Sequence, residues 1–443
     1  MKLWQKDFDV DKKVETFTVG KDRELDLDLA PYDVLGSIAH ATMLAKVGLL
    51  TEDEKDQLVA GLQQIYKEVE AGDFEIKDGI EDVHSQVEFL LTERLGTVGK
   101  KLHSGRSRND QVLVDLKLYM RGEIEQLVDK VSTVFGLLNK LSEEHKELLM
   151  PGYTHMQVAM PSSFGLWFGA YAEALIDDLE VLKGAYKVVN KNPLGSAAGY
   201  GSSFPLDRQM TTDLLGFEVM NYNVVYAQMG RGKVEYIVSN ALASIAATVN
   251  KLSMDTCLYM GQNFGFFSFP SELTTGSSIM PHKKNPDVLE LTRAKCNQLL
   301  ALPTQVSMLT SNLPVGYHRD FQQIKELLMP AFGMLNDCLD MVMLMFSNIT
   351  INKDILDDEK YHYLFSVEVV NQLVLEGVPF REAYKQVGMD IEKGTFKPQK
   401  EVNHTHAGSI GNLCNEEIAA EMQKVVDGFE FKSLHEKLKA LLA

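Results

Sequence analysis

The sequence predicts an all-α fold built around a bundle of long helices. Five segments show the apolar spacing of helices over about 20 residues or more, and their apolar positions cover more than one narrow stripe. Helices apolar on several sides are typical of buried bundles. The 443 residues suffice for two or three domains with an ample core. So much burial also suggests that bundles of several chains pack together.

The first predicted domain, residues 1–106, is mainly helical but less regular than the later part of the chain. Thr51 and Glu54 have the spacing of a capping box, which predicts a helix beginning there and running to about Glu70. Further helices are expected over residues 31–50 and 81–95. From Gly20 to Leu29, apolar and acidic residues alternate, so this stretch is expected to form either a short strand or an extended arm.

The second predicted domain, residues 107–357, is the long-helix bundle itself. Two connections stand out: a proline-bounded loop at Pro151–Pro161 and a Gly/Ser/Pro-rich loop at Lys191–Arg208, long enough to serve a site. Residues 358–443 change to shorter helices and polar loops, which predicts a small C-terminal helical domain. The five long helices are expected over residues 112–141, 164–190, 234–258, 289–309 and 322–346.

Composition excludes several classes of protein. The chain is 45% hydrophobic and 24% charged, as soluble globular proteins are, and its net charge of −18 disfavours nucleic acid and anionic membranes as partners. No apolar run approaches the ~20 residues of a membrane span, and Met1–Asp7 lacks the apolar stretch of a secretion signal. Four widely spaced cysteines indicate buried thiols in a reducing cytoplasm rather than a disulfide framework or a zinc site. Without nucleotide-loop or zinc motifs, neither a cofactor nor a metal is expected.

The stretch Thr275–Glu290 is the strongest candidate for chemistry. Gly276, two serines and two prolines indicate a loop, and Asn285-Pro286-Asp287 resembles a helix start with Asn285 as the cap. Hydroxyls, a histidine and two lysines gather here within a few residues. Such groups can bind a dianion and move a proton beside it, although a solvated surface loop has a similar composition.

A basic cluster at Gly99–Gln111 precedes the first long helix. Its charged residues crowd a glycine-containing turn, so the cluster is either a solvated connection or an anion cradle at a helix N-terminus. Further along, Thr154 and His155 lie in the proline-bounded loop. A single histidine is more often structural than functional. The position of His155 in a loop beside Thr154 favours a functional role only slightly.

Three stretches together resemble the fumarase/aspartase superfamily, whose members eliminate fumarate from substituted succinates. Gly276–Pro286 is similar to its G-S-S-x-M-P-x-K-x-N-P loop at every specified position. Gly105–Gln111 and Gly152–Gln157 are similar to the G-R-S-R-N-D-Q and G-Y-T-H-x-Q segments of the argininosuccinate lyase family. The resemblance implies an all-helical three-domain subunit, a homotetramer, and active sites shared among three subunits.

The resemblance also implies the reaction: elimination of fumarate from argininosuccinate to give arginine, the last step of arginine biosynthesis. It makes Ser277 the base and His155 the general acid, oriented by Glu290. Lys283 would supply positive charge beside the developing dianion. The residues implied to hold the succinyl part are Ser107, Arg108, Asn109, Thr154 and Asn285, and those implied to hold the arginine part are Tyr317, Gln322 and Lys325.

Two departures and two alternatives stand beside this interpretation. The chain has Arg231-Gly232 where the family usually has Arg-Asp, and Gly20–Glu24 lacks the Asn-x-Ser often used on the substrate. One alternative is another fumarate-releasing lyase such as adenylosuccinate lyase. The other is a non-catalytic structural protein of the delta-crystallin kind, which would require the loss of a catalytic group; Ser277, Lys283, His155 and Glu290 are all present.

Overall fold

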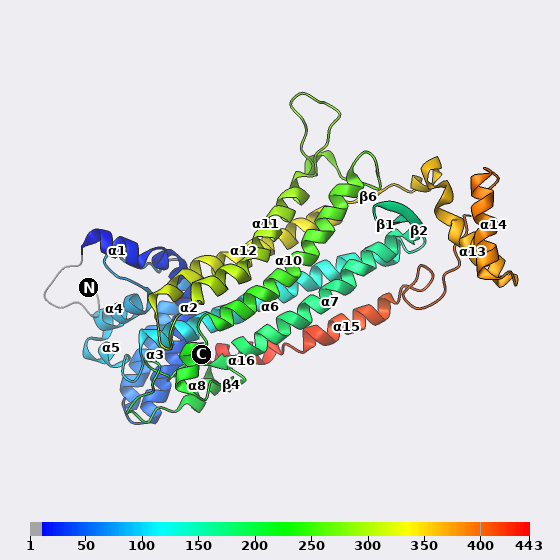
Figure 1. Cartoon of the computed structure of the whole chain (residues 1–443). Helices are drawn as coiled ribbons and strands as arrows, with labels where there is room; N and C mark the ends of the chain where they lie inside the picture. Colours follow the sequence, from blue (N-terminus) through cyan, green and yellow to red (C-terminus); the bar gives the residue numbers. More distant parts are fainter. Residues whose placement is uncertain (1–10, 399) are drawn as a thin grey trace.

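A computed structural model describes residues 11–398 and 400–443, and helices dominate it (Figure 1). The Met1–Asp7 stretch, over which the sequence predicted no secretion signal, lies outside the described residues. Figure 1 shows an elongated molecule in which long helices run from the N-terminal helices at one end to a hairpin and two short helices at the other. The predicted all-α class is confirmed.

Five helices form the central bundle, and each matches one predicted long helix within a few residues. They pack mainly as neighbouring pairs, α6 on α7 and α10 on both α7 and α11, while α12 contacts α6, α10 and α11. Their bounds are Arg108–Glu144 (α6), Phe164–Val189 (α7), Lys233–Met260 (α10), Asp287–Thr310 (α11) and Gln322–Phe346 (α12).

One of these helices, α12, differs from the expectation about membrane spans. By length and composition alone, the stretch Arg319–Phe346 could cross a membrane. Its apolar side chains instead fill the bundle, where Leu328, Phe332, Leu339 and Phe346 are all at most 1% exposed. Burial in a protein core therefore accounts for the apolar composition of α12.

The N-terminal helices pack on one end of the bundle, through α2 against α6 and α12. Thr51 caps α3 as predicted: its hydroxyl accepts from the Glu54 N–H at 3.2 Å, and the Glu54 carboxylate accepts from the Thr51 N–H at 3.1 Å. The five helices are Lys12–Val19 (α1), Asp22–Lys46 (α2), Glu52–Glu70 (α3), Val83–Leu95 (α4) and Thr97–Lys101 (α5).

The prediction of a strand or extended arm between Gly20 and Leu29 is wrong, because these residues form the first turns of α2. Asp22 and Asp26 are one helical turn apart, and both reach Lys325 of α12 at 2.6 Å. Asp22 and Asp26 are therefore buried against a partner about 300 positions away in the sequence. Pro31, the expected start of the helix, lies inside it.

The prediction of a proline-bounded loop at Pro151–Pro161 is also corrected. These residues belong to an antiparallel hairpin of β1 (Leu149–Thr154) and β2 (Gln157–Ser163). Thr154 pairs with Gln157, which leaves His155 and Met156 as a two-residue turn. Both have left-handed backbone, at φ 53° and 62°, a conformation that two-residue hairpin turns require and that usually selects Asn or Gly.

Short elements complete the connections of the bundle. A two-residue parallel bridge joins β3 (Lys191–Asn192) to β4 (Val219–Met220), and an antiparallel one joins β5 (Phe267–Ser268) to β6 (Thr350–Ile351). The remaining helices of this part are Arg208–Leu214 (α8) and Val224–Met229 (α9), with 3₁₀ turns at Ser271–Leu273 and Arg319–Phe321.

The C-terminal residues divide between two places. Helices α13 (Ser366–Leu375) and α14 (Phe380–Glu392) surround a small core of their own at the far end of the molecule (Figure 1). Helix α15 (Asn415–Asp427) then runs back along α6 and α7, and α16 (Phe431–Leu442) reaches α2 and α8. The predicted domain boundaries stay predictions. The 3₁₀ turns here are Ile355–Asp357 and Glu359–Phe365.

Candidate active site

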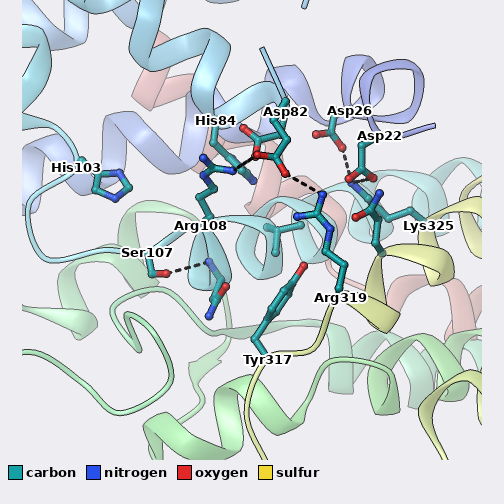
Figure 2. Close-up of a pocket in the computed structure, with 14 residues that line it drawn as sticks. Asp22, Asp26, Asp82, His84, His103, Ser107, Arg108, Tyr317, Arg319 and Lys325 are labelled. Atoms are coloured by element: carbon teal, nitrogen blue, oxygen red, sulfur yellow. Dashed lines mark hydrogen bonds and ion pairs between the residues drawn. The ribbon is translucent and has the colours of Figure 1, made fainter. Parts of the chain in front are cut away.

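A cavity of about 450 Å³ lies where α2, the residues just before α4, the start of α6 and the start of α12 meet (Figure 2). It brings together six of the twelve predicted site residues: Ser107, Arg108, Asn109, Tyr317, Gln322 and Lys325. Eight further lining residues were not predicted as site residues: Asp22, Asp26, Glu81, Asp82, His84, His103, Val112 and Arg319. The arrangement is strongly polar and has both signs of charge.

The start of α6 is fixed by a capping box. Ser107 accepts from the Asn109 N–H at 3.3 Å, and its own N–H donates to Asp110 Oδ1 at 2.8 Å. The other oxygen of Asp110 accepts from the Gly195 and Ala197 N–H groups at 3.0 and 2.9 Å. These bonds hold the Gly/Ser/Pro-rich loop against the helix start, which sets the Ser107–Asn109 segment in place at the cavity.

The basic cluster does not act as one unit. Arg106 is half-buried and donates to Ser37 Oγ at 3.0 Å, and Lys101 is paired with Glu54 on the outside of α3. Arg108 lines the cavity, where its Nη1 lies 3.1 Å from Glu81 and 2.9 Å from Asp82. His103 lines the same cavity. An anion cradle, one of the two open interpretations, is therefore limited to Arg108, His103 and the start of α6.

His40 of α2 supports this turn from inside. Its Nε2 donates to the Ser104 carbonyl at 2.9 Å, while Nδ1 is buried with no hydrogen-bond partner in the described chain. Burial, aided by the charge of Arg106, lowers the pKa of His40 to about 3. The folded protein therefore keeps this imidazole neutral at pH values where an unfolded chain would protonate it.

We expect His40 to make the protein less stable as the pH falls. Below pH 6.5 the His40 imidazole binds a proton in the unfolded chain but stays neutral in the folded chain. Between pH 6.5 and 5 the free energy of unfolding therefore drops by about 2 kcal/mol. His40→Gln keeps a donor toward Ser104 and should lose this part of the pH dependence. Chemical denaturation at pH 7 and pH 5 measures it, with exposed His406→Gln as the control. Equal pH dependence in wild type and His40→Gln would contradict the expectation.

Lys325 and Gln322 tie α12 to the N-terminal helices. Lys325, predicted to contact substrate, is 5% exposed and lies 2.6 Å from both Asp22 and Asp26. Burial raises the pKa of Asp22 to about 6, against the opposing charge of Lys325. Gln322 donates to the Thr18 and Val19 carbonyls at 3.0 and 2.8 Å. Both side chains line the cavity while being held by protein groups.

Removing the Lys325 charge is expected to destabilise the fold strongly. Lys325→Ala leaves Asp22 and Asp26 buried without their cation, which costs about 3–5 kcal/mol in free energy of unfolding. Lys295→Ala, which removes an exposed lysine 3.3 Å from Asp337, should cost less than about 1 kcal/mol. Denaturant titration of both variants compares them. Similar small losses would show that the buried cluster contributes little.

The signature loop surrounds a different cavity, of about 720 Å³, lined by Lys283, Asn285 and Glu290 among others. Thr275 and Asn285 exchange backbone hydrogen bonds at 2.8 and 3.3 Å and close the loop. Ser277 Oγ accepts from the Ile279 and Met280 N–H groups, at 3.3 and 3.1 Å. Two donors on one hydroxyl oxygen favour negative charge there.

Asn285 does not cap the following helix, which corrects the sequence analysis. The residue before α11 is Pro286, and the Asn285 amide is turned toward the Gly276 carbonyl instead, at 3.4 Å. The loop is thus stabilised by contacts within itself. Glu290 lies in the first turn of α11 and is exposed.

The structure does not bring the remaining predicted residues together within one chain. Thr154 and His155 are exposed at the hairpin tip and line neither cavity. His155 and Glu290 make no hydrogen bond or ion pair with each other in the described ranges. Arg108 is the first of the 37 residues of α6, and the hairpin follows the last residue of this helix. At ~1.5 Å per residue, Arg108 and the hairpin are therefore separated by about 55 Å.

The departure at Arg231-Gly232 has a structural reason. Gly232 has φ 81°, and a Cβ there would lie 2.4 Å from Thr310 Cγ2, so an aspartate does not fit. Glu235 provides the acid one turn later: it lies 2.8 Å from Arg231 Nε and accepts from the Gly232 N–H at 2.6 Å. Arg231 also donates to the Phe321 carbonyl at 2.9 Å, behind the Tyr317 segment.

Two signals could have found the missed residues. Asp22 and Asp26 have the i, i+4 spacing of one helix face, which the apparent alternation concealed. Glu81, Asp82 and His84 form a dense run of titratable side chains at the start of a predicted helix. Arg319 offers no such pattern, since only the fold places it beside Glu81, at 2.8 Å.

Comparison with known proteins agrees with the fold and the motifs. A sequence profile described as "Lyase" matches residues 6–301. Among solved structures, an EDDS lyase variant with bound fumarate has a TM-score of 0.76 at 20% identity, covering 96% of this chain and 94% of its own. A class II fumarase from Schistosoma mansoni has a TM-score of 0.72 at 17% identity, covering 94% of each chain. The chain therefore belongs to this lyase family.

Full-length relatives narrow the assignment. An argininosuccinate lyase of Parabacteroides distasonis is 62% identical over 100% of this chain and 99% of its own length, and one of Bacteroides thetaiotaomicron is equally similar. One of Thermotoga neapolitana is 38% identical over 87% of this chain and 97% of its own. Within the lyases, the chain is a member of the argininosuccinate lyase family, and neither alternative from the sequence analysis is favoured.

Proposed function

We propose that this lyase reversibly eliminates fumarate from argininosuccinate to give arginine, as the last step of arginine biosynthesis. The observation that carries the proposal is the full-length identity of 62% to argininosuccinate lyases. The Ser277 loop and the Ser107–Asn109 segment supply groups suited to this reaction. The enzyme would be a carbon–nitrogen lyase acting without a cofactor.

The first step removes a proton from the carbon next to a succinyl carboxylate. Ser277 would take this proton as an alkoxide, and its oxygen already accepts two backbone N–H groups that favour negative charge. The electrons of the broken C–H bond pass into the neighbouring carboxylate. Lys283 and Asn285 of the same loop would stabilise the resulting dianion.

The second step breaks the carbon–nitrogen bond. The electron pair of the dianion forms the double bond of fumarate, and the guanidino nitrogen leaves with the electrons of the C–N bond. A general acid makes this departure easier by delivering a proton to that nitrogen. We assign this task to His155, whose position at the tip of a rigid hairpin suits contact with a neighbouring subunit, and orientation of its ring to a partner's Glu290.

The separation of these groups supports a homotetramer with shared sites. The cavity, the signature loop and the hairpin would converge only when different subunits supply them. Bundle helices α10 and α11 also expose large apolar side chains suited to such packing: Tyr236, Met254, Leu291, Leu300 and Met308 are 40–73% exposed. The site would then hold one of the three stretches from each of three subunits, and Thr154 would join Ser107, Arg108 and Asn109 on the succinyl carboxylates.

We place the enzyme in the cytoplasm, with a small-molecule substrate and no nucleic acid or membrane as partner. All four cysteines are free thiols, which suits a reducing compartment. The net charge of −18 repels polyanions. A substrate with several carboxylates must therefore be attracted by local groups.

The test is fumarate release, followed by ultraviolet absorbance, from argininosuccinate and adenylosuccinate in parallel. Release from argininosuccinate alone is the expected result. Release from adenylosuccinate would keep the chemistry and overturn the substrate. Absence of release from both would overturn the proposed function and favour a structural role.

A further inference from the structure

We propose that His84 binds a carboxylate group of the substrate through its Nε2, while the buried Asp33 fixes the ring from behind through Nδ1. The inference rests on the proposed function, because it concerns the same cavity and a carboxylate-bearing substrate. His84 belongs to none of the sequence stretches predicted to contact substrate. Its assignment comes from its surroundings in the fold.

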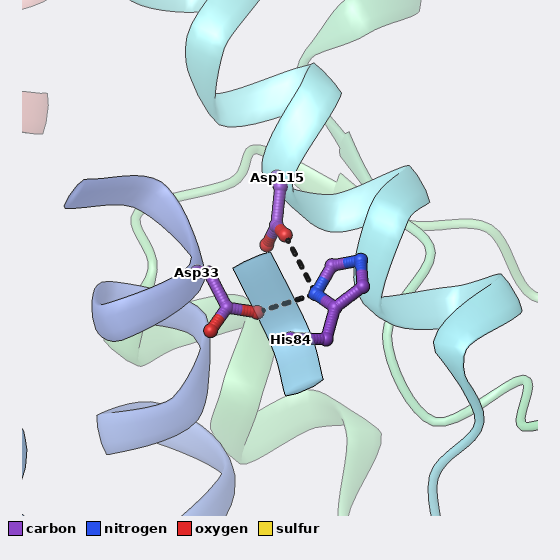
Figure 3. A group of neighbouring side chains, drawn as sticks. All are labelled: Asp33, His84 and Asp115. Atoms are coloured by element: carbon purple, nitrogen blue, oxygen red, sulfur yellow. Dashed lines mark hydrogen bonds and ion pairs between the residues drawn. The ribbon is translucent and has the colours of Figure 1, made fainter. Parts of the chain in front are cut away.

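The ring of His84 is held by groups from two other helices. Its Nδ1 lies 2.7 Å from Asp33 Oδ1 of α2 and 3.4 Å from Asp115 Oδ2 of α6 (Figure 3). The three side chains are 6%, 2% and 1% exposed. In Figure 3 both contacts end on one ring nitrogen, and the other nitrogen points away from the carboxylates. The protein therefore sets the direction of Nε2 before any ligand arrives.

Nε2 is available to a ligand. His84 lines the 450 Å³ cavity, close to Asp82 and Arg108 (Figure 2). No described residue forms a hydrogen bond with Nε2, and this atom is not among the buried polar atoms that lack a partner. When the ring is protonated, Nδ1–H donates to Asp33 and Nε2–H is a donor that a ligand in the cavity can accept from.

The charge balance of the cavity indicates what this donor would bind. The carboxylates that line it are Asp22, Asp26, Glu81 and Asp82, and the permanent cations are Arg108, Arg319 and Lys325. Each of these cations is paired with a lining carboxylate. His84 differs because its carboxylate partners lie behind the ring, outside the cavity lining. The lining carboxylates Asp82 and Asp26 also act on its charge, but no described group is hydrogen-bonded to Nε2, which stays available to a ligand.

The surrounding groups favour the protonated form of His84. Burial lowers its pKa, but the hydrogen bond to Asp33 and the charges of Asp33, Asp82 and Asp26 outweigh burial and raise the pKa above its usual value. Asp115 takes the neutral form more readily, since burial and the adjacent Asp33 raise its pKa well above normal. Arg106 and Arg108 act on the neighbouring His103, where burial and these two charges lower the pKa to about 4. An imidazolium facing the cavity forms a strong, charge-assisted bond with a carboxylate.

The same three residues have the side-chain types of a metal site, but their spacing favours a hydrogen bond. Ligands on a tetrahedral ion at ~2.0–2.2 Å stand about 3.4 Å apart. Nδ1 and Asp33 Oδ1 are 2.7 Å apart, which is the length of a direct N–H···O bond. The hydrogen bond between His84 and Asp33 therefore occupies Nδ1, which is the nitrogen that a metal in this cluster would have to bind.

The test compares His84→Asn with His84→Gln. The Asn amide stands where Nδ1 does and can keep the bond to Asp33, but it removes the group facing the cavity. The Gln amide reaches the place of Nε2 as an uncharged donor. Calorimetric titration of each full-length oligomer with fumarate and with arginine separates the two possible sources of the carboxylate, and melting temperatures report on folding.

We expect His84→Asn to weaken the binding of one product about tenfold or more, with His84→Gln recovering part of the loss and both variants melting near wild type. Loss for fumarate assigns the succinyl carboxylate, and loss for arginine the amino-acid carboxylate. Wild-type affinity in both variants overturns the inference, as do equal losses for both products with lowered melting temperatures. Wild type that binds neither product overturns it too. Product binding without turnover of argininosuccinate overturns only the proposed function.

Discussion

Replacing Ser277 with alanine is expected to lower turnover of argininosuccinate by at least about a thousandfold, because it removes the oxygen assigned to take the carbon-bound proton. Ser277 Oγ accepts two backbone N–H groups in this structure, so the loop is already arranged to hold an alkoxide. Alanine removes the oxygen and leaves the loop closure between Thr275 and Asn285 intact. Product binding and the oligomer should be retained.

The measurement is single-turnover fumarate release, together with calorimetric binding of fumarate and sedimentation of the variant. Ser271→Ala is a matched control, since Ser271 is an exposed serine in the same connection but outside the signature motif. It should behave like wild type. Turnover within tenfold of wild type in Ser277→Ala would remove Ser277 as the base.

Mixing two inactive variants is expected to restore activity when their substitutions lie in different stretches. Ser277→Ala affects the loop and Asn109→Ala the N-terminal cavity. These positions lie at opposite ends of bundle helices, α11 alone spanning about 36 Å over its 24 residues. If each site takes the two stretches from different subunits, random hybrids have about a quarter of their sites free of both substitutions.

Co-expression with two affinity tags isolates the hybrids, and fumarate release measures the recovery. Ser277→Ala mixed with Lys283→Ala is the matched control, because both substitutions lie in one loop and no hybrid site can escape them. Recovery in the first mixture only is the expected result. No recovery in either would show that each site is built from one chain.

Much of the fold could be predicted because the bundle is encoded locally. Buried apolar residues, such as Leu242 in α10, Leu299 in α11 and Leu339 in α12, are part of patterns that recur with helical spacing on several sides of these helices. Such a pattern can be recognised in the sequence without knowing which helix packs against it. The capping box of Thr51 and Glu54 is equally local and was found. The beginning of α2 was not, since Asp22 and Asp26 are buried only because Lys325 meets them from another helix.

The candidate site divides in the same way. Motif residues such as Arg108 and Ser277 stand in recognisable strings of sequence, so their roles could be predicted from the sequence. The structure shows where these residues lie, and their roles stay predictions. The contributions of Arg319 and His84 depend on neighbours distant in the sequence. Pairing of Arg319 with Glu81 and fixing of His84 by Asp33 arise only on folding. Sequence motifs alone cannot contain such pairs.

The length of α6 carries a further consequence. Under the proposed assembly the length of this helix sets the distance between two parts of different active sites. The cavity segment is fixed at its first residue, and the hairpin with His155 follows its last residue. One inserted residue would turn everything after it by about 100° and shift it by ~1.5 Å. Two different active sites would then be misaligned by a change distant from both. We expect insertions and deletions to be tolerated at connections such as residues 71–79 and to be excluded from α6.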